Sequence, residues 1–107
     1  MNENKFNYNH RIELQKEVQQ EGEFGEINVS FETIKRVWAN IKPITGNQNF
    51  SKMKQEVDIT HYIETRYLKD GLNCKKIIFK NRTFNVISII CPDEKNEKLL
   101  FNVKEVL

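Results

Sequence analysis

Cysteine, proline and glycine are scarce in this sequence, and long apolar runs are absent. The two cysteines, Cys74 and Cys91, lie far apart and lack the spacing of metal ligands, which argues against a zinc site. No hydrophobic segment opens the chain, and no apolar run approaches the length of a membrane span. These absences predict a reduced, cytoplasmic setting away from membranes, with buried thiols in place of a disulfide.

The patterns that indicate catalysis or a cofactor are also missing. Gly22 and Gly25 lack the lysine of a phosphate-binding loop. His10 lies at the edge of a polar N-terminal segment. His61 lies on the mainly apolar face of a predicted strand, so we interpret it as a packed, hydrogen-bonded histidine and not as a ligand. Without a nucleophile beside a base, the sequence predicts no enzyme, no metal and no cofactor.

Charge is unevenly distributed along a chain that is nearly neutral overall. The 107 residues fit one domain with a real core, and the hydrophobic fraction of 38% is somewhat low, which suggests long loops or surfaces completed by partners. The net charge of +2 does not by itself indicate a nucleic-acid binder. Six glutamates and one lysine lie within residues 13–32, whereas residues 75–82 hold four cations and no acid. Charged segments of this kind are typical of solvated strands. They are also typical of surfaces whose charge is complementary to that of a partner or a polyanion.

Alternation of apolar and polar residues predicts a mainly β fold. About six strands are expected in a small antiparallel barrel or sandwich of meander order, with long loops and at most one short helix. The strands are expected within residues 11–19, 27–42, 57–67, 76–80, 83–91 and from 99 to the C-terminus. A phase break over residues 33–36 predicts a bulge or a bend in the second strand. Residues 1–9 are expected to form a flexible N-terminal arm, with Phe6 and Tyr8 as possible anchors, and residues 10–107 the single domain.

Two predicted strands differ in how clearly their faces can be assigned. The β-branched run of residues 57–67 places His61 and Tyr67 on its apolar face. In residues 83–91 the apolar residues occupy both faces. Alternation there places Phe84, Val86 and Ile90 opposite Ile87 and Ile89.

The segment from Val37 to Gly46 contains the only tryptophan and one of the two prolines. Pro43 cannot donate a ladder hydrogen bond, so the strand is expected to end there. An excursion loop of about residues 44–56 follows, with a marginal helix over residues 47–55. Trp38 is expected to fix the barrel wall to a neighbouring element. The structural anchors that we predict are Trp38, Pro43, His61, Tyr67 and Phe84.

A group of aromatic residues leaves a second function open. Trp38, Tyr62 and Tyr67, with Arg66 nearby, are residue types that form stacking platforms for single-stranded nucleic acids on small β-barrels. Such a platform usually includes a basic groove, whereas the strand that carries Tyr62 also contains acidic residues. Packing at a core edge or an interface is the favoured interpretation. Nucleic-acid binding is the alternative.

Several short motifs follow one another in an order that resembles a known family. They are His10-Arg11-Ile12-Glu13-Leu14-Gln15, Val37-Trp38-Ala39 leading to Pro43 and Gly46, Thr60-His61 with Arg66-Tyr67, Lys80-Asn81-Arg82-Thr83-Phe84-Asn85-Val86, and Glu105. From about residue 10 to residue 106 the sequence resembles the tailed-bacteriophage head–tail joining family, whose members are also called head-closure, stopper or adaptor proteins. It departs from the family pattern near the second strand, where Phe24-Gly25-Glu26 and Phe31 stand in place of paired glycines and a tryptophan.

The resemblance implies a small β-barrel without catalysis that works in the head–tail connector of a phage or prophage. There it would form a ring below the portal and adaptor, close the DNA-filled head and offer a docking surface to the tail. The implied partners are portal or adaptor proteins, a tail-completion or tail-tube protein, further copies of the chain, and packaged DNA through its phosphates. The implied location is the host cytoplasm during assembly and then the virion.

The resemblance also implies candidate sites. In some relatives a loop projects into the channel and plugs it, and the loop of residues 44–56 is the candidate here because it leaves the barrel at a strand end. Its candidate channel or joining residues are Ile44, Thr45, Gly46, Asn47, Phe50, Lys52 and Lys54. Candidates for a surface that faces another subunit or DNA are Lys75, Lys76, Lys80 and Arg82, with the acidic residues 13–32 as a possible match.

Overall fold

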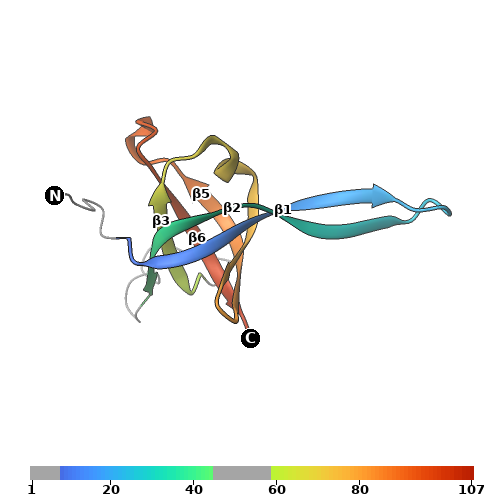
Figure 1. Ribbon diagram of the computed structural model, residues 1–107, viewed down its shortest axis with the longest axis horizontal. Helices are drawn as coiled ribbons and strands as arrows, with labels where there is room; N and C mark the ends of the chain where they lie inside the picture. Colours follow the sequence, from blue (N-terminus) through green and yellow to red (C-terminus); the bar gives the residue numbers. More distant parts are fainter. Residues whose placement is uncertain (1–7, 45–58) are drawn as a thin grey trace.

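A computed structural model describes residues 8–44 and 59–107 (Figure 1). This part of the chain is mainly β, as predicted. Its strands are β1 (His10–Glu21), β2 (Ile27–Pro43), β3 (His61–Arg66), β4 (Cys74–Phe79), β5 (Arg82–Ile90) and β6 (Lys98–Val106), and its two short 3-10 helices are η1 (Lys69–Asn73) and η2 (Pro92–Glu94). The helix predicted over residues 47–55 lies outside the described residues.

The six strands close into a barrel in the order β1-β2-β3-β6-β5-β4, with antiparallel neighbours. The expected meander order is wrong, because β3 pairs with β6 and β4 returns to pair with β1. The chain segment that contains η1 connects β3 to β4 (Figure 1). Closure removes the free edges that an open six-stranded sheet would leave.

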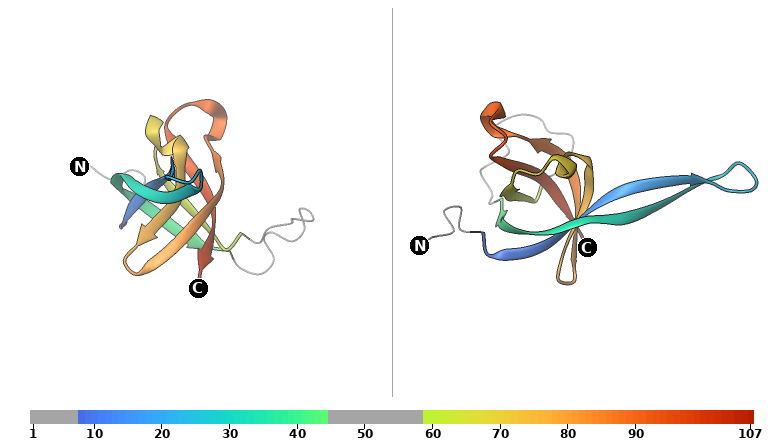
Figure 2. Two further views of the ribbon diagram at one scale, coloured as in Figure 1. Left: turned by 90° about the vertical axis from the view of Figure 1, so that its right-hand side faces the viewer. Right: turned by 45° about the horizontal axis from the view of Figure 1, so that its top comes forward.

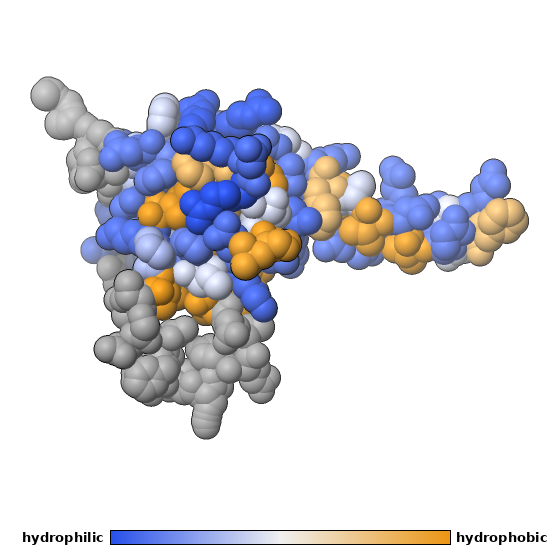
Figure 3. Space-filling view, turned by 90° about the horizontal axis from the view of Figure 1, so that it is seen from below, coloured by the Kyte–Doolittle hydropathy of each residue, from blue (hydrophilic) through white to orange (hydrophobic). Residues whose placement is uncertain are grey.

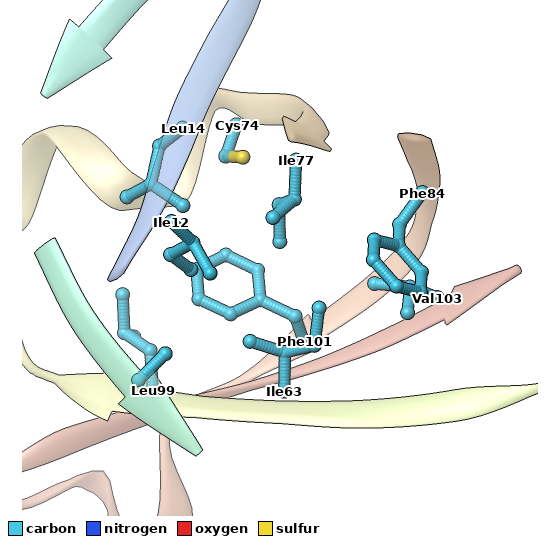
Figure 4. Packing of buried hydrophobic residues seen from close by; sticks show 10 residues of the cluster. Ile12, Leu14, Ile63, Cys74, Ile77, Phe84, Leu99, Phe101 and Val103 are labelled. Atoms are coloured by element: carbon cyan, nitrogen blue, oxygen red, sulfur yellow. The ribbon is translucent and has the colours of Figure 1, made fainter. Parts of the chain in front are cut away.

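Side chains from all six strands fill the barrel (Figure 4). Phe84 and Phe101 are the largest side chains in this core, and the predicted alternation of the last strand is confirmed by the full burial of Leu99, Phe101 and Val103. Both cysteines are free, and burial raises the pKa of the Cys74 thiol to about 11. The core consists of Ile12, Leu14, Ala39, Ile63, Cys74, Ile77, Phe84, Leu99, Phe101 and Val103.

Strand β5 departs from simple alternation. Its register against β6 shifts between Val86 and Ser88, and the shift reverses which side chains face inward. Ile89 therefore packs against the core, whereas Ile90 is 45% exposed. The expectation that Ile90 shares the face of Phe84 is wrong for this reason.

The β1–β2 hairpin is much longer than the barrel requires. Strand β4 pairs with β1 only at residues 13–16, and β3 pairs with β2 only at residues 39–43. Residues 17–31 therefore pair only with one another and form a projecting two-stranded ribbon, the hairpin arm (Figures 1 and 2). The β1–β2 register shifts between Leu14 and Gln15, which confirms the predicted bulge in residues 33–36 where the arm leaves the barrel.

One residue before the first strand is fixed to the barrel. Tyr8 is buried, and its hydroxyl donates a hydrogen bond of 2.7 Å to Glu64 of β3. Burial, together with this bond, raises the pKa of Tyr8. Tyr8 is thus an anchor, as its aromatic ring suggested, whereas Phe6 lies outside the described residues.

Core and surface aromatic residues should differ sharply in what they contribute to stability. Phe101→Ala removes a fully buried ring and should lower the free energy of unfolding by about 3–5 kcal/mol. Trp38→Ala, at a ring that is 52% exposed, should cost about 1 kcal/mol or less. Urea denaturation followed by circular dichroism measures both. Equal losses would contradict the outward position of Trp38.

Candidate assembly surfaces

Residues from three of the sequence motifs meet where β3, β5 and β6 lie together. Arg82 donates hydrogen bonds of 2.9 and 3.0 Å to the two carboxylate oxygens of Glu105. Its Nη2 atom lies 3.3 Å from Nε2 of His61. The hydroxyl oxygen of Thr60 lies 2.8 Å from Nδ1 of His61 and accepts the backbone N–H of Glu105, also at 2.8 Å. We call these four residues the Arg82 cluster.

Phe84 packs against the Arg82 cluster from the core side. Its ring centre lies 5.2 Å from that of His61 in an edge-to-face arrangement and 5.1 Å from the Arg82 guanidinium. His61 is packed and hydrogen-bonded, as predicted. Two of the predicted anchors, His61 and Phe84, therefore belong to one unit that joins three strands.

The electrostatics of the cluster favour a structural role. Hydrogen bonding to Arg82 lowers the pKa of Glu105, and the same bonds raise the pKa of Arg82. Burial, followed by the positive charge of Arg82, lowers the pKa of His61. A carboxylate whose two oxygens are both held by one guanidinium is poorly placed to take a proton from a substrate. The geometry thus suits a clamp between strands.

The segment predicted as an excursion begins next to this cluster, at the end of β2. Strand β2 ends at Pro43, as predicted, and Pro43 stands opposite His61 in the β2–β3 register. Ile44 then donates its N–H to the carbonyl oxygen of Thr60 at 2.9 Å, so the two ends of the connection are held together. The other candidate loop residues, Thr45, Gly46, Asn47, Phe50, Lys52 and Lys54, lie outside the described residues.

The four basic candidates of residues 75–82 occupy three different settings. Lys75 is exposed near the start of β4, where the amino group of Lys76 lies 4.0 Å from the ring centre of Phe31. Lys80 lies in the turn after β4 with a φ of 56°. A strand of this length spans about 17–20 Å, which separates Lys80 from the first two lysines. Arg82 belongs to the ion pair with Glu105.

A pocket of about 420 Å³ opens on the outside of the barrel around Trp38. Trp38 is 52% exposed and contacts the guanidinium of Arg11 on the neighbouring strand, 5.2 Å from the ring centre, so this predicted anchor contributes to a surface and not to the core. Tyr67, in contrast, both packs on the core and lines the pocket. We call this site the Trp38 pocket. Its lining residues are Arg11, Lys35, Arg36, Val37, Trp38, Arg66, Tyr67 and Leu68.

The Trp38 pocket brings together three of the four residues considered as a stacking platform, namely Trp38, Arg66 and Tyr67. Tyr62 is not among the lining residues. The sequence interpretation missed the contribution of Arg11, Lys35 and Arg36. The pairing of β1 with β2 places Arg11 directly opposite Trp38. Knowledge of this register would have revealed the contribution of Arg11.

The hairpin arm carries a row of exposed apolar side chains (Figure 3). Ile27, Val29 and Phe31 alternate along β2, and their direct partners on β1 are Glu21, Gln19 and Glu17. Directly opposed residues of an antiparallel pair share a face, so polar and acidic side chains flank the apolar row. Exposed apolar patches of this kind are typical of interaction surfaces.

The described part of the chain thus combines a closed β-barrel, a projecting arm, a basic pocket and an ion pair between strands. Among residues 8–44 and 59–107, no group of three metal-ligating side chains occurs. Within the same ranges, no helix is long and apolar enough to cross a membrane.

The model of the phage head completion protein family matches residues 4–106, and the chain belongs to this family. The resemblance noted in the sequence is thereby confirmed. The family makes the chain a structural protein of the phage head, which acts together with other proteins of the particle. A search of curated proteins finds no match.

Two solved structures share the fold. Protein SF1141 from Shigella flexneri 2a is 24% identical, with a TM-score of 0.75 over 96% of each chain. A chain of the virion of a native gene transfer agent particle is 17% identical, with a TM-score of 0.64 over 92% of this chain and 96% of that chain. Both similarities support the barrel architecture described above.

The Arg82 cluster predicts a dependence of stability on pH. The pKa of His61 is lowered in the folded chain, so the unfolded chain binds a proton first as pH falls below about 6.5, the usual pKa of histidine. The free energy of unfolding should therefore be at its full value above this pH and decrease below it. Denaturant titrations between pH 7.5 and 5 measure the decrease.

The His61→Gln variant isolates this contribution. It removes the titrating ring, so its stability should change less than that of the unmodified chain over the same pH range. Glu105 contributes at lower pH. Because its pKa is lowered in the folded chain, it stabilises the fold at pH values above the usual carboxyl range. This stabilisation is lost as pH falls through the folded-state pKa of Glu105. Identical pH profiles for the variant and the unmodified chain would refute the assignment to His61.

Proposed function

We propose that the protein forms a ring in the head–tail connector of a phage or prophage, below the portal and adaptor. The ring closes the DNA-filled head and gives the tail a surface on which to dock. The observation that carries this proposal is the combination of membership of the head completion family with a hairpin arm that extends beyond the barrel. Within the described residues, the two strands of the arm pair only with each other.

The surfaces of the molecule support a ring of identical copies. The hairpin arm exposes apolar side chains, and a hydrophobic fraction of 38% is in keeping with burial completed between subunits. The arm is acidic, whereas the start of β4 carries Lys75 and Lys76. A head-to-tail ring requires two different surfaces on each subunit that are complementary to one another.

The proposed partners follow from the position of the ring in the particle. They are portal or adaptor proteins on the head side and a tail-completion or tail-tube protein on the tail side. DNA that passes through the channel is contacted through its phosphates, without readout of base sequence. The loop that begins at Ile44 is the proposed channel or joining element. The protein acts in the host cytoplasm during assembly and then in the virion.

Charge reversal of two basic residues tests the assembly surface. The double variant Lys75→Glu/Lys76→Glu should reduce head–tail joining roughly tenfold or more, the effect of about 1.4 kcal/mol at each contact. Complementation of a gene deletion, scored as joined particles, measures the loss. Lys104→Glu changes the charge of an exposed residue on β6 and serves as the control. Normal joining by the double variant would remove these lysines from the interface.

Nucleic-acid binding is a second candidate function, favoured by the cations and aromatic rings of the Trp38 pocket. Trp38 is the only tryptophan, so quenching of its emission reports directly on a base stacked in the pocket. For a connector protein we expect no quenching by short single-stranded DNA at physiological salt. Quenching with an affinity that weakens steeply as salt increases would favour the second function.

A further inference from the structure

The tip of the hairpin arm is held in a defined shape. The N–H of Gly22 donates to the carbonyl oxygen of Glu26 at 2.7 Å, and the carboxylate of Glu26 accepts the N–H of Phe24 at 3.1 Å. Gly25 has a φ of +85°, a conformation that favours glycine. The N–H of Gly25 also donates to the carbonyl oxygen of Gly22. Two backbone hydrogen bonds and one side-chain hydrogen bond thus organise the loop.

Gly22 leaves room at this tip for the carboxylate of Glu26. The Glu26 carboxylate lies against its Cα, and a Cβ at this position would stand 1.8 Å from Oε2 of Glu26. A side chain here would displace the group that holds Phe24. The loop therefore presents Phe24 on a preorganised backbone, with 90% of the side chain exposed.

The surroundings of Phe24 are uniformly acidic. Residues 17–31 of the arm contain four glutamates and no lysine or arginine. Three of the glutamates, Glu21, Glu23 and Glu26, lie within three residues of Phe24 in the chain. A surface that is complementary to an aromatic side chain among carboxylates has an apolar floor and a basic rim.

The Trp38 pocket has these two properties. Its apolar surface comes from Val37, Trp38, Tyr67 and Leu68, and the lining residues include four cations and no acid. Arg36 is paired with Glu13 at 3.4 Å, whereas Lys35 is exposed at the rim. The volume of about 420 Å³ lies in the range of pockets that accept organic groups.

The arm cannot fill the pocket of its own chain. Phe24 precedes β2 and Trp38 lies near its other end, and the intervening residues are extended. The ten residue steps of strand from Ile27 to Val37 span about 33 Å. The arm also points away from the barrel (Figures 1 and 2). An arm tip that enters the Trp38 pocket must therefore come from another copy of the chain.

We propose that Phe24 at the arm tip of one copy inserts into the Trp38 pocket of a neighbouring copy of this chain. Each copy then has one donor surface and one different acceptor surface, so the contact is head-to-tail and generates a ring when its rotation closes. The inference deepens the proposed function and rests on it. It gives the ring a named subunit contact.

A photo-cross-linking residue at the arm tip identifies the occupant. The aromatic photo-cross-linker p-benzoylphenylalanine replaces Phe24 in the full chain, and joined particles are irradiated after complementation. The expected product is a covalent dimer of this chain, with the cross-link mapped to residues that line the Trp38 pocket. The same photo-cross-linker at Val106, an exposed residue at the end of β6, is the matched control and should not label the pocket.

The cross-linked product separates this inference from the proposed function. A product that contains nucleic acid or another particle protein overturns the inference, and so does the absence of any product in joined particles that contain the chain. Joined particles that lack the chain altogether contradict the proposed function instead. If the substitution at Phe24 itself abolishes joining, the exchange of charges between Glu23 and Lys35 tests the contact instead.

A charge exchange tests the same contact without altering either aromatic ring. Glu23→Lys on the tip and Lys35→Glu on the pocket rim should each reduce joining, because each places like charges together. The two changes combined should restore joining at least in part. Lys104→Glu combined with Glu23→Lys is the control and should restore nothing. Equal joining by the matched and mismatched combinations overturns the contact.

Discussion

Pairing of β1 with two partners is the constraint on which the rest of the structure depends. Strand β1 pairs with β2 along its whole length on one side, and its residues 13–16 pair with β4 on the other, which closes the sheet. Because β1 and β2 continue together after β4 and β3 have ended, their pairing outside the barrel becomes the hairpin arm. One extended pair thus provides both the closed core and the surface that reaches outward.

The Arg82 cluster stabilises the barrel where the excursion loop leaves it. Thr60, His61, Arg82 and Glu105 come from distant parts of the sequence, and their hydrogen bonds connect the start of β3 with β5 and β6. Three short motifs that look unrelated in the chain are therefore parts of one clamp.

Sequence reasoning predicted most of the strands because burial on one side imposes a period of two. It was successful for β6, where Leu99, Phe101 and Val103 alternate inward, and for the bulge in β2. It failed in β5, where a register shift reverses the inward face between Val86 and Ser88. The candidate surfaces were predicted only in part. Arg66, Tyr67 and Trp38 were recognised as a group, whereas Arg11, Lys35 and Arg36 become neighbours only through pairing.

The sequence by itself determined the β-strands, the end of β2 at Pro43, the polarity of each segment and the family, since these depend on local alternation, backbone chemistry and motif order. Only the tertiary structure decided the strand order, the length of the hairpin that extends beyond the barrel, and the outward position of Trp38. These features depend on which strands pair and where their pairing stops. Strand pairing depends on contacts between residues that are far apart in the sequence, so no single segment of the chain determines it.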